Sequence, residues 1–272
     1  MAHSEWEGGL IGGINDAPIY YEVLGEGKVL VLLHAGVADC RMWDEQFETF
    51  AEHYRVIRYD LRGFGRSSVP SSHFAQHDEL AEILAFLSVS HASILGVSYG
   101  GKVALDFTLA HPEMVEKLIL VAPSVSGSEP SPDVLAFYEA EEKALAAEDL
   151  QGATELNLKM WVDGPKRSPE EVNPSVRERI GEMQYHAFQT VFPEEAVEPD
   201  LEPPAALRLA EVKVPTLLIV GDYDIQAKID QAHRLASEIA GAQLAVIAQA
   251  AHIVNMEKPA EFNALVLDFL AQ

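Results

Sequence analysis

An unbroken aliphatic run, Val29 to Leu33, constrains the fold of this chain more than any other feature. Continuous apolar character without alternation is typical of a strand buried on both faces, as the inner strands of a parallel sheet are. Further strand-length apolar runs follow, and they alternate with amphipathic helical patterns. The expected later strands are 54–60, 91–97, 115–122, 216–220 and 243–247, and the expected helices are 42–53, 75–87, 100–110, 227–239 and 259–270. This alternation predicts an α/β fold with a mostly parallel, doubly wound sheet, preceded by a short β meander over 9–14 and 19–24.

The alternation stops between residues 124 and 212. This stretch contains helical patterns but no convincing buried strand, and prolines cluster at both of its ends. A chain of 272 residues has room for one large domain that carries an insertion. We therefore expect an α/β core formed by residues 1–123 and 213–272, with residues 124–212 inserted as an α-helical cap.

The composition excludes several kinds of partner. The chain has 19 Lys and Arg residues against 43 Asp and Glu residues, which gives a formal net charge of −24 at pH 7. A surface this negative repels nucleic acid and anionic membranes, so neither is an expected partner. The single cysteine, Cys40, allows no disulfide within the chain, and no apolar run reaches the ~20 residues that span a bilayer. Because residues 1–7 also lack the pattern of a signal peptide, we expect a cytoplasmic protein.

The segment Gly96-Val97-Ser98-Tyr99-Gly100 lies between an expected strand and an expected helix. A G-x-S-x-G segment in this position is typical of a nucleophile elbow, a sharp turn that exposes the serine hydroxyl above the strand ends. Small neighbours are needed because the turn brings backbone segments very close together. In the alternative interpretation the glycines only make a tight connection and Ser98 caps the helix. The position of the segment between a strand and a helix favours the interpretation of Ser98 as a nucleophile.

A serine nucleophile needs a general base, and the base needs an acid to orient it. In elbow hydrolases these residues follow the serine in the order acid and then histidine. Asp222 and Asp224 come directly after the strand expected at 216–220, and His252 lies in the loop after the last expected strand. Order and spacing therefore select His252 as the base of Ser98 and leave two candidate acids.

An acyl-transfer site also needs backbone N–H groups that stabilise the developing oxyanion. Tyr99, directly after the candidate nucleophile, is expected to supply one donor. Gly36 or Val37, in the loop after the first buried strand, is expected to supply the other. His34 in the same loop is expected to brace the loop by hydrogen bonds rather than to transfer protons.

Together these features resemble the α/β-hydrolase superfamily, in particular its serine hydrolases of the carboxylesterase and lactonase branch. The segment Asp60 to Ser67 looks like the D-x-R-G-x-G-x-S segment of the esterase, lactonase and carbon–carbon hydrolase branches. In the family the acid ends a G-x-x-D segment, which implies Asp224, with Asp222 as the alternative. The resemblance thus implies a triad of Ser98, Asp224 and His252.

The resemblance covers residues 1–123 and 213–272, whereas the insertion matches the family's helical cap only in position and length. Ala35 stands where family members usually have glycine after the histidine. This departure leaves Gly36 and Val37 as alternative oxyanion donors.

The function implied by the resemblance is hydrolysis of carboxylic esters or lactones through an acyl-enzyme on Ser98, without a cofactor. No metal-binding, dinucleotide-binding or P-loop motif is present in the sequence. A carbon–carbon bond hydrolase or a perhydrolase would share the triad, and some relatives are small-molecule receptors with slow turnover. Haloalkane dehalogenases and epoxide hydrolases use an aspartate nucleophile, so Ser98 argues against both.

The expected cap carries charge rather than a motif. Residues 124–212 hold 19 acidic and 7 basic side chains. A negative field at the entrance lowers the local concentration of anions, which predicts small, neutral, moderately hydrophobic esters or lactones as substrates. Trp161 and Met160 are the candidates for lining the substrate pocket, because aromatic and methionine side chains suit an apolar, adaptable cavity. The sequence leaves the oligomeric state open.

Overall fold

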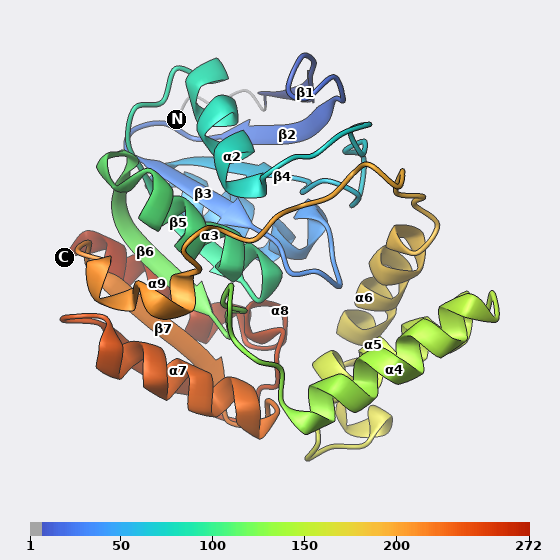
Figure 1. Cartoon of the computed structure of the whole chain (residues 1–272). Helices are drawn as coiled ribbons and strands as arrows, with labels where there is room; N and C mark the ends of the chain where they lie inside the picture. Colours follow the sequence, from blue (N-terminus) through green and yellow to red (C-terminus); the bar gives the residue numbers. More distant parts are fainter. Residues whose placement is uncertain (1–6) are drawn as a thin grey trace.

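A computed structural model describes residues 7–272 of the chain (Figure 1). The residues at the very N-terminus on which the signal-peptide prediction rests therefore lie largely outside the described part. Eight strands form one sheet in the order β1-β2-β4-β3-β5-β6-β7-β8. The strands are β1 (Glu7–Ile11), β2 (Ile19–Leu24), β3 (Val29–Leu33), β4 (Arg55–Tyr59), β5 (Ala92–Val97), β6 (Val115–Val121), β7 (Thr216–Gly221) and β8 (Gln243–Ile247).

The sheet is mostly parallel. β2 pairs antiparallel with β1 and with β4, and every other neighbouring pair is parallel. The core helices are α1 (Asp44–Ala51), α2 (Gln76–Phe86), α3 (Tyr99–Ala110), α7 (Gln226–Glu238), α8 (Val254–Glu257) and α9 (Pro259–Ala271). The prediction of a doubly wound, mostly parallel α/β fold is confirmed.

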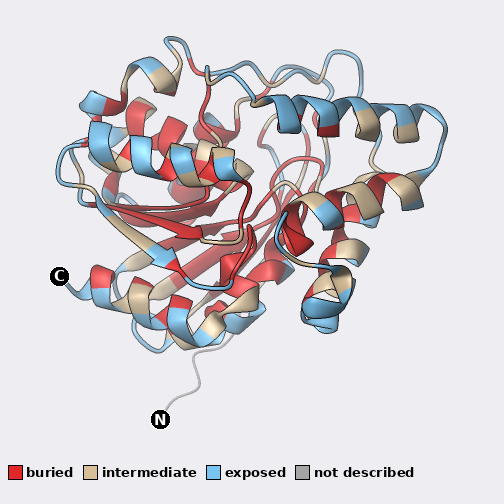
Figure 2. Ribbon diagram, turned by 90° about the horizontal axis from the view of Figure 1, so that it is seen from below, coloured by how far each residue is buried: buried red, intermediate tan, exposed pale blue. Residues whose placement is uncertain are grey.

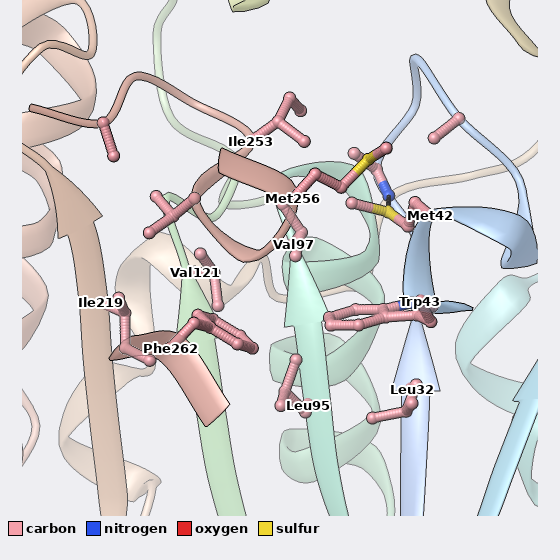
Figure 3. Packing of buried hydrophobic residues seen from close by; sticks show 14 of the residues in the cluster. Leu32, Met42, Trp43, Leu95, Val97, Val121, Ile219, Ile253, Met256 and Phe262 are labelled. Atoms are coloured by element: carbon pink, nitrogen blue, oxygen red, sulfur yellow. Dashed lines mark hydrogen bonds between the residues drawn. The ribbon is translucent and has the colours of Figure 1, made fainter. Parts of the chain in front are cut away.

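Side chains of the inner strands point alternately to the two faces of the sheet, and each face is covered by helices. In β3, Leu30 and Leu32 join the cluster that includes α1, α8 and α9, whereas Val31 and Leu33 join the cluster that includes α2, α3 and part of α7. Figure 3 shows the first cluster, where Trp43 and Phe262 pack over Leu32 and Leu95. Figure 2 shows the central strands as buried, and burial on both faces explains the uninterrupted apolar run of β3.

Some boundaries differ from the predicted ones. The helix expected at 42–53 begins with a 3₁₀ turn, Cys40–Trp43, before α1. The first strand ends at Ile11 rather than at residue 14, because the chain already turns at Gly13, which adopts a positive φ as do Asn15 and Asp16. The four-residue helix α8 is too short for its hydrophobic pattern to indicate it.

The stretch that breaks the alternation is helical and lies to one side of the sheet (Figure 1). We use the name cap helices for α4 (Pro132–Ala146), α5 (Leu150–Asn157), the π-helical turn Leu158–Asp163 and α6 (Pro174–Ala187). Residues 188–204 return from α6 to the core, and Ala205 and Leu209 are buried among core side chains. The boundaries 124 and 212 of a separate cap stay a prediction.

Among the described residues, no helix is long and apolar enough to cross a membrane.

Candidate active site

Ser98 occupies a strained turn between β5 and α3. Its φ of 54° and ψ of −109° lie in a region that side-chain-bearing residues rarely adopt. The turn is possible because its neighbours lack side chains. A Cβ at Gly96 would lie 2.2 Å from the carbonyl oxygen of Gly100, and a Cβ at Gly100 would lie 2.4 Å from that of Leu33. The glycines of the G-x-S-x-G segment are therefore a steric requirement of this turn.

His252 is held by Asp224 and not by Asp222. His252 Nδ1 lies 2.8 Å from Asp224 Oδ2, and both side chains are buried. The other oxygen of Asp224 accepts the backbone N–H of Ile225 at 2.8 Å. With its Nδ1–H donated to Asp224, the neutral imidazole has Nε2 available to accept a proton.

Asp222, the alternative acid, has a different partner. Its Oδ1 accepts the backbone N–H of Gln249 at 2.6 Å, which ties the end of β7 to the loop after β8. Asp224 therefore binds His252, whereas Asp222 stabilises the loop after β8.

Ser98 and His252 line one cavity of about 840 Å³. Hydrogen bonds among residues 7–272 join His252 to Asp224 but not to Ser98. A bond between nucleophile and base commonly closes only when substrate is bound. The arrangement can therefore support nucleophilic catalysis on a substrate held in this cavity.

The candidate oxyanion donors lie side by side in the cavity wall. Tyr99, Gly36 and Val37 all line the cavity with Ser98. A Cβ at Gly36 would lie 3.4 Å from Tyr99 Cβ, so the loop after β3 contacts the start of α3. Both Gly36 and Val37 remain candidates for the second donor.

His34 braces this loop, as the sequence predicted. Its Nε2 accepts the backbone N–H of Leu61 at 2.9 Å, and its Nδ1 donates to the carbonyl oxygen of Ala35 at 2.8 Å. This pattern needs a neutral ring, and burial in turn lowers the pKa of His34. Protonation of Nε2 would break its hydrogen bond with the backbone of Leu61, so His34 has a structural role and not that of a general base.

The pKa of His34 makes the stability of the fold depend on pH. Between the lowered pKa and the ordinary histidine value of about 6.5, the unfolded chain binds a proton that the folded chain excludes. Stability is therefore expected to fall as the pH drops below about 6.5. Urea unfolding of the wild type and of a His34→Gln variant, at about pH 7.5 and about pH 5.5, measures this loss. The variant should lose less on acidification, and equal losses in both proteins would contradict the assignment.

The Asp60–Ser67 segment shapes the neighbouring loops through the Asp60 carboxylate. Asp60 accepts the backbone N–H groups of Cys40 and Arg66, both at 2.8 Å. Asp39, Cys40 and Asp60 bring three potential metal ligands close together. Asp39, however, forms an ion pair with Arg41, with Oδ2 and Nη2 2.7 Å apart. These contacts indicate that the cluster stabilises the loops rather than binding a metal ion.

Of the two side chains expected to line the pocket, the structure places only Trp161 in the cavity wall. Its ring centroid lies 4.7 Å from that of His252. Met160 is not part of the wall and packs, half-buried, against the hydrophobic cluster. Both belong to the π-helical turn, in which successive side chains point in different directions, so adjacent residues do not share the cavity.

Several polar residues of the cavity wall are not apparent from the sequence. Glu141 and Asn157 come from the cap helices, and Asn157 Nδ2 donates to Glu141. Glu198 accepts the hydroxyl hydrogen of Tyr99. Lys228, in the first turn of α7 and four residues after Asp224, is a buried cation in the wall. No motif marks these residues, and only the spacing of Lys228 from Asp224 could have drawn attention to one of them.

The sequence of this chain matches a known protein family. The family described as alpha/beta hydrolase fold matches residues 28–259, which is most of the chain. The chain belongs to this alpha/beta hydrolase family. It is therefore a hydrolase by family.

The relatives include esterases and other hydrolases. A pimeloyl-[acyl-carrier protein] methyl ester esterase of Yersinia enterocolitica is 30% identical, covering 93% of this chain and 98% of that protein. A 2-hydroxy-6-oxononadienedioate/2-hydroxy-6-oxononatrienedioate hydrolase of Escherichia coli is also 30% identical, covering 93% and 91%. The crystal structure of the enol-lactonase of Burkholderia xenovorans superposes with a TM-score of 0.77 at 26% identity, covering 95% of this chain and 98% of that one.

Proposed function

We propose that this hydrolase cleaves small carboxylic esters or lactones through an acyl-enzyme on Ser98. The observation that supports this most is the buried His252–Asp224 hydrogen bond, 2.8 Å long, on a cavity that also contains the strained Ser98 turn. The esterase and lactonase relatives add support at the level of reaction class.

The proposed reaction proceeds in two displacements. Ser98 Oγ attacks the carbonyl carbon while His252 Nε2 takes the hydroxyl proton, and Asp224 stabilises the imidazolium. The N–H of Tyr99, with that of Gly36 or Val37, stabilises the oxyanion. Collapse of the tetrahedral intermediate expels the alcohol, which takes the proton from His252. Water then attacks the acyl-enzyme by the same steps, and free Ser98 and the acid are released.

This proposal needs only protein groups and water, so we expect no cofactor and no metal ion. The cavity volume of about 840 Å³ suits a small molecule. The prediction of neutral substrates rests on the charge of the cap as a whole. Lys228 adds a positive charge inside the cavity, where the substrate is bound.

Carbon–carbon bond hydrolysis is the second candidate. The Escherichia coli relative, named for that type of substrate, is as similar to this chain as the Yersinia esterase. Either reaction would use Ser98, Asp224 and His252. The two reactions are therefore distinguished by which substrates the enzyme hydrolyses.

A substrate panel tests the proposal directly. We expect hydrolysis of para-nitrophenyl acetate, of short-chain methyl esters and of simple lactones, followed by product formation at equal enzyme concentration. A 2-hydroxy-6-oxo-dienoate, whose carbon–carbon bond is the one cleaved, serves as the competing substrate. A higher kcat/KM for the dienoate would favour the second candidate, and binding without turnover of any compound would contradict both.

A further inference from the structure

Lys228 is a buried ammonium group in the wall of the candidate active-site cavity. The residue is only 9% exposed, and it lines the same cavity as Ser98 and His252. Its Nζ donates to the carbonyl oxygen of Pro123 and to Ser124 Oγ, each at 3.0 Å. An ammonium group has three N–H donors, so one remains for a ligand.

Within the described part of the chain, no carboxylate forms an ion pair with this charge. None of the ion pairs within 4 Å among residues 7–272 includes Lys228. Asp224 is the carboxylate whose charge acts on it, but its two oxygens already accept hydrogen bonds from His252 and from the backbone of Ile225. Buried charges are normally paired, because leaving water without a counter-ion is costly. An anion in the cavity would supply the missing partner.

The other carboxylates of the cavity wall do not fill this role. Glu198 is paired with Lys102, and Glu141 accepts a hydrogen bond from Asn157. Glu129 is exposed to solvent. The positive charge at Lys228 is therefore not neutralised by the acidic groups that the cap contributes.

Hydrogen bonds through Ser124 connect the ammonium to the backbone of Ser98. Ser124, which accepts a hydrogen bond from Lys228, donates its backbone N–H to the carbonyl oxygen of Ser98 at 2.9 Å. Gln231 Nε2 donates to the same Pro123 oxygen at 2.6 Å, which fixes the position of that carbonyl. Because Ser98 and Lys228 line the same cavity, a substrate bound to Ser98 could also contact Lys228.

We propose that Lys228 binds a free carboxylate of the substrate, so that the preferred substrates carry a carboxylate in addition to the ester or lactone bond. This inference rests on the proposed function and reverses the preference for neutral substrates that the charge of the cap predicts. The exposed carboxylates of the cap act through solvent, where salt screens them, whereas Lys228 acts in direct contact inside the cavity.

Matched pairs of methyl esters test the inference. Monomethyl succinate, glutarate and adipate are compared with methyl butanoate, pentanoate and hexanoate, in which a methyl group replaces the carboxylate. We expect the wild type to have the higher kcat/KM for the carboxylate of at least one pair, at low and at high salt. Lys228→Met should lower the ratio of the two kcat/KM values about tenfold to a hundredfold, the usual effect of a charged hydrogen bond.

Two control variants separate the local charge from other effects. Lys228→Arg retains a cation and should keep most of the preference. Lys143→Met removes the same charge from an exposed position on α4 and should leave the ratio unchanged. Because each ratio is measured within one protein, a general loss of activity cancels. Circular dichroism and the Tm of each variant check its folding.

The wild type gives a measurement that does not depend on any variant. Burial lowers the pKa of Lys228 to about 8. The groups facing its Nζ are the uncharged Pro123 carbonyl and Ser124 hydroxyl, and Asp224 is the charged group that acts on it. The ammonium therefore loses its proton as the pH rises through about 8, and the preference for the carboxylate should fall over that range. His252 acts on both esters of a pair, so a change in rate that both esters share cancels in the ratio.

The outcomes distinguish the two proposals. Hydrolysis of the neutral esters, with no preference for any carboxylate or with a ratio that Lys228→Met leaves unchanged, would overturn the carboxylate site alone. Failure of the wild type to hydrolyse either kind of ester would overturn the proposed function and this inference with it.

Discussion

Ser98→Ala is expected to lower kcat by about 10⁶-fold, because removing the nucleophile of a serine triad leaves only the residual catalysis of the binding site. The fold should be retained, since alanine adopts the positive φ of this turn at about the same cost as serine. Steady-state hydrolysis of the best ester from the panel, with an active-site titration of the wild type, measures the effect.

Ser237→Ala is the matched control. Ser237 lies exposed on α7, and its hydroxyl donates to the backbone carbonyl of Arg234 within the same helix. This variant should retain full activity. If carefully purified Ser98→Ala enzyme kept more than about 1% of the wild-type rate, another residue would be the nucleophile.

Asp224→Asn should lower kcat by about 10⁴-fold, the effect that the equivalent change has in other serine triads. The amide group of asparagine can donate to Nδ1 of His252, which favours the imidazole tautomer with its hydrogen on Nε2. That tautomer cannot accept the proton of Ser98. The rate is measured from about pH 6 to about pH 9, so that a shifted optimum is not mistaken for a loss.

Asp222→Asn provides the comparison at the neighbouring carboxylate. An asparagine oxygen can still accept the N–H of Gln249, so this change should cost much less activity than Asp224→Asn. If Asp222→Asn proved the more damaging variant, the acid of the triad would be Asp222, and the hydrogen bond from His252 to Asp224 would have only a structural role.

The sheet could be predicted from the sequence because buried parallel strands leave a signal in consecutive residues. Val29–Leu33 is apolar on both faces, and the structure shows why, with Leu32 and Leu33 packed in different clusters. The elbow was equally visible, because its glycines are required by backbone contacts within a few residues and across to β3. Such local steric requirements are recorded in short motifs.

The cavity wall could not be predicted in the same way. Lys228 is one of 19 basic residues, and nothing local distinguishes a lysine buried beside Pro123 from one on the surface. Met160 and Trp161 are equivalent as apolar neighbours in the sequence, and only the π-helical turn separates them. These properties depend on contacts between segments distant in the chain, which leave no periodic pattern.

The division of the cavity between two parts of the chain affects how this enzyme can evolve. Much of the wall comes from the cap helices and the segment returning from them, which carry none of the three residues of the proposed triad. Mutations there can vary the size and shape of accepted substrates while the reaction itself is preserved. Lys228 is different, because it lies only one helical turn beyond Asp224 and shares its segment. Selection for a new charge preference would therefore act on the same few residues that maintain catalysis, so this trait should diverge more slowly than chain-length preference.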